Sequence, residues 1–389
     1  MQAFVYRRYG GPDVVELSEV PKPVPRDKEV LVKIHATTVT SGDWRVRTMC
    51  VPTGLGTIAR LAFGFTRPRQ PIMGSEMAGT IESVGKDVTR FRVGDEVFGF
   101  PGGAMGCHAR YRAMPEDGRL ARKPANLSFE EAASLPFGAS TSLHFLRKAG
   151  IRPGDKVLVI GASGGVGTAM VQLAKHHGAE VTGVTSTNNV ALVASLGADR
   201  VIDYTKDDFT TRRETYDIVV DTVGKTPFAR CKPVLKEKGR LLAVAAGIPE
   251  MLATLWAPLT GSRRVIAGPA EERVSDMSEM AALAEAGVLR PVIDRRYLFA
   301  QMAEAHAYVE TGRKRGSVVV SVEPARSSYV LYATKWGRGR DPLRKQRGGE
   351  VVLIANMMPG CDEVLTHLTY PTLRAGPLLL PPLRGRRGQ

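Results

Sequence analysis

A glycine-rich turn joins an apolar strand to a helix near the middle of this chain. Residues 157–160 are Val-Leu-Val-Ile, residues 161–167 are Gly-Ala-Ser-Gly-Gly-Val-Gly, and a helical pattern covers 166–177. Glycine at such a turn lets backbone amides approach a diphosphate at the positive end of the helix dipole. This order of elements predicts a dinucleotide site, with a purely structural turn as the alternative. The residues expected around the diphosphate are Ala162, Ser163, Gly164, Gly165 and Val166.

Strand and helix patterns alternate around this turn. Further strands are predicted at 180–185, 200–203, 218–221 and 240–246, and further helices at 191–196 and 275–287. Such alternation is typical of a parallel sheet with helices on its faces. The central region is therefore predicted to be α/β, a Rossmann-type doubly wound parallel sheet.

The first 125 residues show a different pattern. Residues 29–36 alternate with a period of two, and 78–85 and 93–99 are short β runs that contain glycines. Short strands at this spacing predict a compact, barrel-like β domain. The pair Cys107-His108 is too short for a metal site by itself, and we expect it to be a detail of a surface strand.

The chain has 389 residues and a net charge of +15, and its last part is the most basic. Residues 324–389 hold 11 Lys or Arg against 4 Asp or Glu, with many Pro and Gly. A segment of this composition buries little apolar surface, so we expect an irregular extension over 323–389, with a short strand at 350–355. Its aromatic residues are sparse, which does not favour nucleic-acid binding.

Two further patterns indicate where in the cell this protein is located. No run of about 18 apolar residues occurs, so no membrane span is expected. The four cysteines lie far apart, without a C-x-x-C pair, and the chain starts without an apolar leader. This pattern is typical of a reducing compartment and predicts a cytoplasmic protein.

The turn after strand 180–185 bears on the choice of nicotinamide cofactor. NAD sites usually place an Asp or Glu there to bind the ribose hydroxyls. This turn instead contains Ser186, Thr187 and Asn188, whose hydroxyl and amide groups can donate to a 2′-phosphate. NADPH is therefore predicted over NADH, although the turn offers no Lys or Arg for a charge-assisted bond.

Several stretches together resemble the medium-chain dehydrogenase/reductase superfamily, and within it the zinc-free quinone oxidoreductase-like branch. They are residues 74–85, 93–99, 122–128, the glycine turn, 196–204 and 315–320. The resemblance implies a GroES-like β-barrel catalytic domain made of 1–125 and 266–322. It implies a Rossmann cofactor domain at 126–265, an active site between the two, and often a homodimer.

The same resemblance bears on the metal. Zinc alcohol dehydrogenases of this superfamily use a Cys in an early loop and a His directly before a glutamate. The matching segments here are Ser41-Gly42-Asp43 and Gly74-Ser75-Glu76. Serine at these positions is a poor zinc ligand, so no metal is expected. Without a metal, NADPH would deliver hydride to a small quinone or α,β-unsaturated carbonyl substrate.

Three residues are implied to take part in the reaction. Thr40 matches the family position next to the substrate carbonyl, and Thr141 matches a threonine that lines the nicotinamide site. Asp43 is the third, and its alternative role is to cap a helix.

Three further residues complete the expected cofactor site. Tyr204 matches a tyrosine beside the adenosine phosphate, with a core aromatic as the alternative. Gly224 and Gly247 follow strands at the carboxyl edge of the sheet, where ligands bind in such folds. The competing functional hypothesis is a non-catalytic NADPH-binding sensor, or a nucleic-acid binder that uses the basic extension.

Overall fold

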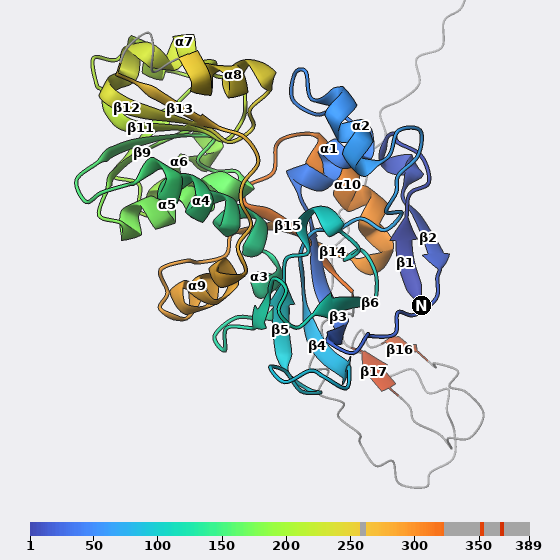
Figure 1. Ribbon diagram of the computed structural model, residues 1–389. Helices are drawn as coiled ribbons and strands as arrows, with labels where there is room; N and C mark the ends of the chain where they lie inside the picture. The colour runs from blue at the N-terminus through green and yellow to red at the C-terminus, as the bar shows by residue number, and fades with distance from the viewer. Residues whose placement is uncertain (257–261, 323–350, 354–365, 369–389) are drawn as a thin grey trace, which may run out of the picture. The chain divides into compact units, whose positions relative to one another are not determined.

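The computed structural model describes residues 1–256, 262–322, 351–353 and 366–368 (Figure 1). The chain divides into two compact units, Met1–Ala325 and Arg326–Gln389. In the second unit, β16 (Val351–Leu353) pairs antiparallel with β17 (Thr366–Leu368), so a strand does form within 350–355. The expected irregularity of the rest of 323–389 concerns residues outside the described ranges.

One sheet of the first unit has six parallel strands in the order β10-β9-β8-β11-β12-β13. Their bounds are β8 (Lys156–Ile160), β9 (Glu180–Thr185), β10 (Arg200–Asp203), β11 (Tyr216–Asp221), β12 (Leu235–Ala243) and β13 (Arg264–Ala267). The strand order reverses at β8, which precedes the glycine turn. This is the doubly wound arrangement, so the predicted α/β class is confirmed.

Both faces of this sheet are covered. Val157 and Val159 of β8 lie in one apolar cluster with Met170 of α5, whereas Leu158 lies in another with Cys231 of α7. Successive side chains of a strand point to opposite faces, so a strand between two helical layers must be apolar throughout. Figure 1 shows α4 and α5 on one side of the sheet and α7 and α8 on the other. The helices of this region are α3 (Phe129–Ala133), α4 (Pro136–Ala149), α5 (Gly165–His176), α6 (Val190–Ser195), α7 (Phe228–Cys231), α8 (Ile248–Trp256) and α9 (Val274–Glu285).

The second sheet follows the order β14-β15-β3-β4-β5-β7, and β6 also pairs with β3. The bounds are β3 (Glu29–Val39), β4 (Met77–Val84), β5 (Glu96–Gly99), β6 (Tyr111–Pro115), β7 (Leu120–Arg122), β14 (Ile293–Leu298) and β15 (Ser317–Ser321). Two strands near the N-terminus, β1 (Gln2–Val5) and β2 (Glu16–Glu19), form a separate antiparallel pair. Strand β15 pairs antiparallel with β3, so the chain returns to this sheet after forming the parallel sheet.

Helices interrupt the N-terminal region, where the sequence predicted mainly strands and turns. They are α1 (Ser41–Thr48) and α2 (Gly56–Phe63), and α10 (Met302–Glu310) follows β14. The expectation for Cys107-His108 was wrong, because both residues are fully buried. The ring of His108 lies 5.3 Å from the ring of His306 on α10, centroid to centroid.

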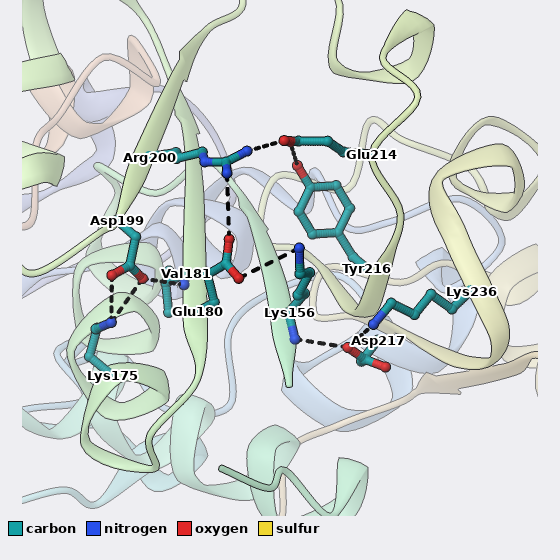
Figure 2. A network of polar contacts seen from close by, with 10 residues as sticks. All are labelled: Lys156, Lys175, Glu180, Val181, Asp199, Arg200, Glu214, Tyr216, Asp217 and Lys236. Carbon is teal, nitrogen blue, oxygen red and sulfur yellow. Dashed lines mark hydrogen bonds and ion pairs between the residues drawn. The ribbon is translucent and has the colours of Figure 1, made fainter. Parts of the chain in front are cut away.

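Ion pairs link the strands of the parallel sheet at their amino ends (Figure 2). Lys156 at the start of β8 lies 3.6 Å from the carboxylate of Glu180 at the start of β9, and Glu180 also faces Arg200 of β10. On the other side, the backbone N–H of Lys156 donates to Asp217, which also pairs with Lys236. This edge of the sheet is closed by paired charges, whereas the glycine turn lies at the opposite, carboxyl edge.

Candidate cofactor and substrate site

The glycine turn after β8 is shaped by contacts that exclude side chains. Gly161 has φ +78°, in the left-handed region that favours glycine. A Cβ on Gly167 would lie 2.1 Å from the carbonyl oxygen of Gly161, so a side chain there would collide with backbone. These two glycines therefore allow the close packing of α5 on β8.

The amides of the turn divide into two groups. Those of Gly161 and Ala162 both donate to the carbonyl of Val184 at 3.1 Å, so they are used within the fold. Gly165 and Val166 open α5, and the first amides of a helix have no intrahelical acceptor. Of the five residues predicted at the diphosphate, these two lie in the first turn of α5, where the helix dipole favours an anion.

Ser163 joins the glycine turn to the turn after β9. Its hydroxyl oxygen accepts hydrogen bonds from Thr185 at 2.8 Å and from Asn189 at 3.2 Å. The intervening Ser186 is half-buried, whereas Thr187 and Asn188 are exposed. The structure thus brings together the two turns that the sequence assigned to one cofactor.

An acid that sequence reasoning missed lies at this second turn. Thr187 donates to Asp203, the last residue of the adjacent strand β10, at 2.6 Å. The exposed Lys206 ammonium lies 3.7 Å from the same carboxylate. Tyr204 is 61% exposed, so it is not a core aromatic. The parallel register of β10 with β9, in which Asp203 faces Thr185, was the signal that could have placed this acid.

Gly224 and Gly247 occupy different surroundings beyond the sheet edge. Gly224 has φ +76° and lines a cavity of about 110 Å³ next to Asp221. The Asp221 carboxylate accepts three backbone amides, including that of Gly224 at 2.9 Å, and so fixes this loop. Gly247 is buried, and a Cβ there would lie 2.8 Å from the carbonyl oxygen of Thr53.

Thr40 and Asp43 form a capping box at the start of α1. The Thr40 hydroxyl donates to the Asp43 carboxylate at 2.6 Å and accepts from the Asp43 amide at 3.1 Å. The second carboxylate oxygen of Asp43 accepts the amide of Gly74 at 3.1 Å. The helix-capping alternative for Asp43 is therefore what the structure shows, and the single hydroxyl proton of Thr40 is already donated.

Two neighbouring residues, Ser75 and Glu76, were noted in the sequence only as part of a segment that lacks a zinc ligand. The Ser75 hydroxyl is buried and has no hydrogen-bond partner among the described residues. Thr141, by contrast, donates its hydroxyl proton to the carbonyl of Phe137 at 2.8 Å. An unpaired buried hydroxyl is costly, which marks Ser75 as a candidate ligand contact.

Glu76 is 1% exposed and joins two elements. Its carboxylate accepts from the Thr38 hydroxyl on β3 and from the backbone N–H of Phe137 at 2.5 Å, at the start of α4. Burial raises the pKa of Glu76 to about 7, although both hydrogen bonds oppose this shift. Sequence alone gives no signal that this glutamate lies at the junction of β3 and α4.

Within the described ranges, no group of three or more His, Cys, Asp or Glu side chains is arranged to hold a metal ion. The three cysteines described there, Cys50, Cys107 and Cys231, are free thiols. The helices of the described part are also too short or too polar to cross a membrane.

Known families match most of the first unit. The family described as "Alcohol dehydrogenase GroES-like domain" matches residues 26–125, and "Zinc-binding dehydrogenase" matches residues 196–320. The 2-methylene-furan-3-one reductase of Solanum lycopersicum is 34% identical over 336 residues, which cover 83% of this chain and 80% of that protein. The chloroplastic NADPH-dependent alkenal/one oxidoreductase of Arabidopsis thaliana is 32% identical and covers 82% of this chain and 79% of that protein.

A solved structure shows the same architecture. The quinone oxidoreductase from Coxiella burnetii aligns with a TM-score of 0.75 at 30% identity, over 83% of this chain and 99% of that one. These matches confirm the predicted fold class, in which a GroES-like domain is combined with a Rossmann-type parallel sheet. The chain belongs to the medium-chain dehydrogenase/reductase superfamily, in the branch of quinone oxidoreductases and alkenal/one reductases.

Proposed function

We propose that this protein is an NADPH-dependent reductase of quinones or α,β-unsaturated carbonyl compounds that works without a metal ion. The observation that carries the proposal is the glycine turn, which leads from β8 into the N-terminus of α5 at Gly165. Relatives with the same fold are named for reduction of alkenals, enones and quinones.

The residues present fit a dinucleotide. The first amides of α5 would hold its diphosphate, and the turn from Ser186 to Asn188 together with Tyr204 would hold the adenosine end. Gly224 and Gly247 would border the cofactor beyond the sheet edge. When bound, NADPH supplies a hydride, and the protein supplies orientation and charge stabilisation.

Hydride arrival at an enone or quinone places negative charge on a carbonyl oxygen, which must be met by a hydrogen-bond donor. We assign this contact to the region of Thr40 and Thr141, and we add the Ser75 hydroxyl. Ser75 is favoured because its hydroxyl has no partner in the described structure, whereas those of Thr40 and Thr141 are engaged. Asp43 then acts through Thr40 and Gly74 as a positioning residue.

Metal independence is supported by side-chain chemistry. Ser41 and Ser75 stand where zinc members of the superfamily carry a Cys and a His, and serine hydroxyls are weak zinc ligands. Metal analysis of the purified, active protein tests this point. Activity that is lost with a chelator and regained with Zn²⁺ would overturn it.

NADPH is proposed over NADH because the turn after β9 carries hydroxyl and amide donors instead of an acid, and because a lysine lies nearby. Lys206 offers an ammonium 3.7 Å from the Asp203 carboxylate that Thr187 also contacts, and this ammonium supplies the charge that the turn itself lacks. The Asp203 carboxylate beside it would bind the ribose hydroxyls of NADH or repel the 2′-phosphate of NADPH. The relative strength of the Lys206 and Asp203 contacts therefore decides the preference between NADPH and NADH.

We further propose a catalytic domain of 1–125 with 266–322, a cofactor domain of 126–265, a homodimer, and a cytoplasmic location. Strand β15 pairs with β3 in the second sheet, which we call the catalytic sheet, and this pairing supports the return of 266–322 to the catalytic domain. Strand β13 spans the proposed boundary at residue 265. The free cysteines fit a reducing compartment. Named relatives include chloroplastic and mitochondrial proteins.

The function is tested by the rate of NADPH oxidation with a panel of quinones, enones and alkenals. Reduction of at least one class, with NADPH used in preference to NADH, is the expected result. NADPH binding without turnover on the whole panel would favour the non-catalytic sensor instead. Salt-sensitive nucleic-acid binding that requires 324–389 would support the nucleic-acid alternative.

A further inference from the structure

Lys314 brings a positive charge from the catalytic sheet to the glycine turn. A Cβ built on Gly165 would lie 3.0 Å from the Lys314 ammonium nitrogen. Gly165 is the first residue of α5, at the positive end of the helix dipole. The ammonium therefore adds a positive charge at the same end of the helix.

The backbone holds this lysine in place. The amide of Gly316 donates to the carbonyl of Ser163 at 2.8 Å, and Gly316 and Gly164 form a parallel bridge. Strand β15 begins at Ser317, directly after this contact. The segment 314–316 thus clamps the glycine turn to the strand that lies beside β3.

The Lys314 ammonium makes few polar contacts with the described residues. Lys314 is half-buried, and within the described ranges its ammonium donates one hydrogen bond, to the carbonyl of Gly316 at 2.6 Å. No carboxylate lies within 4 Å of it among the residues that the structure describes, although Glu76 and Asp294 raise its proton affinity from farther away. Burial lowers the pKa of Lys314 to about 8. An ammonium with two unused N–H groups in such a place is suited to an anionic ligand.

We propose that Lys314 is a cofactor-binding residue whose ammonium contacts the diphosphate of the dinucleotide at the glycine turn. This inference rests on the proposed cofactor and deepens it, since the charge comes from the catalytic sheet and the amides come from the Rossmann sheet. Binding of the diphosphate thereby ties the two parts of the site together. No residue near 314 was expected at the cofactor from the sequence.

The test is the affinity for NADPH, measured by fluorescence titration without any acceptor. Lys314→Met removes the charge and keeps the stem, and we expect affinity to fall by about tenfold or more. Arg313→Met is the matched control, because it removes an exposed positive charge from the same turn, and we expect less than about a twofold change. Lys314→Arg should retain the wild-type affinity within severalfold.

A second ligand separates a local effect from a structural one. The probe 2′-AMP carries the adenosine phosphate and lacks the diphosphate, so Lys314→Met should bind it as the wild type does. Equal weakening of both ligands, equal loss in Arg313→Met, or unchanged NADPH affinity in folded Lys314→Met would overturn the proposal. None of these measurements involves turnover, so failure of the reductase assay alone would leave the inference standing.

The pH profile gives an independent readout. Above about pH 8 the free ammonium deprotonates, so wild-type NADPH affinity should decrease as pH rises through this range. The 2′-phosphate, with a second pKa near 6, does not titrate there. Glu76 and Asp294, the acids that face Lys314, are ionised there as well. Lys314→Arg should remove the decrease, and a profile that is identical in both proteins would contradict the assignment.

Discussion

The carboxylate of Glu76 accepts the backbone N–H of Phe137 at 2.5 Å, which joins the sheet that contains β3 to the first turn of α4. A negative charge at a helix N-terminus is favoured by the helix dipole, yet this one is almost fully buried. The same helix packs on the glycine turn, where a Cβ on Gly138 would lie 2.3 Å from the carbonyl of Gly165. Glu76 therefore holds α4 between the two sheets.

Ionisation of Glu76 should lower stability as pH rises. Its folded pKa of about 7 lies above the unfolded value, so the folded state binds the proton more tightly. The contribution is fully present below about pH 4.5 and is lost as pH rises through 7, by an amount on the order of 3 kcal/mol. Glu76→Gln is neutral at every pH, and its unfolding free energy relative to wild type should rise between pH 5 and pH 8.

Urea unfolding at pH 5, 6, 7 and 8 measures this difference. The exposed Glu279→Gln is the control, because it removes a carboxylate that is half in solvent and lies outside the junction of β3 and α4. A Glu76→Gln difference that stays constant or falls with pH would show that the carboxylate is better solvated than its burial indicates.

Much of the parallel sheet was predictable because its signals are local. The predicted strands 180–185 and 200–203 coincide with β9 and β10, and the apolar strand 157–160 lies within β8, since buried parallel strands are short apolar runs. Helix α2 was missed because the N-terminal region was interpreted from its β pattern alone, and α1 was anticipated only as the helix that Asp43 could cap. The cap of α1 depends on Asp43, three residues after Thr40, which a strand pattern does not reveal.

His306 should make the protein sensitive to acid. Both ring nitrogens are buried without a partner in the described structure, and burial holds the pKa of His306 well below its usual range. The unfolded chain then binds the proton preferentially, so stability is present above about pH 6.5 and falls as pH decreases. His306→Leu should be more stable than wild type at pH 5, and by a smaller margin at pH 7.5.

Thermal or urea unfolding at the two pH values checks this. The exposed His176 gives the matched control, since His176→Leu removes a histidine that water already solvates. If the stability of His306→Leu followed the same pH course as wild type, an ordered water or another partner would have to satisfy the ring.

Gly164→Asp should abolish cofactor binding without unfolding the protein. Gly164 is the N-cap of α5 with φ −79° and ψ 174°, a conformation open to any residue. A Cβ there meets only the carbonyl of Gly161 at 3.4 Å, and Asp is a preferred N-cap. The new carboxylate would instead repel the diphosphate.

Gly164→Asn is the neutral partner for this comparison. NADPH titration should show at least about tenfold weaker binding for Asp than for Asn, at equal melting temperatures. Equal affinities would mean that the diphosphate lies elsewhere. Gly167→Ala, in contrast, should destabilise the fold, because its Cβ would lie 2.1 Å from a backbone oxygen.

The candidate site was predictable only in part, for a physical reason. The glycine turn can be identified from consecutive residues, because its backbone conformation depends on local sequence. Contacts between distant segments cannot be identified in this way. Lys314 approaches Gly165, Asp203 accepts from Thr187, and Ser75 is buried without a partner only when the chain folds. Sequence reasoning therefore predicted the cofactor loop and missed the charged and polar groups that other strands bring to it.

Ser75→Ala separates a catalytic hydroxyl from a structural one. The hydroxyl is buried and unpaired, so its removal should leave the unfolding free energy unchanged or raise it by up to about 1 kcal/mol. If it stabilises the substrate oxyanion, kcat should fall by about tenfold or more. Ser134→Ala is the control, because Ser134 is buried and donates to the carbonyl of Glu131 at 2.7 Å. It should lose about 1 kcal/mol of stability and keep its kcat; the reverse pattern would remove Ser75 from the reaction.

Lys206→Ala tests which nicotinamide the protein selects. Lys206 is exposed and lies 3.7 Å from Asp203 at the turn expected to hold the adenosine end. Its ammonium can pair with a 2′-phosphate, which NADH lacks, so NADPH affinity should fall by about tenfold while NADH affinity stays within about twofold. Because Asp203 would then face the 2′-phosphate without its cation, Asp203→Asn in the same background should restore part of the loss. Parallel titrations with both cofactors measure the ratio, and an equal decrease for the two would assign Lys206 to the stability of the turn instead of to phosphate recognition.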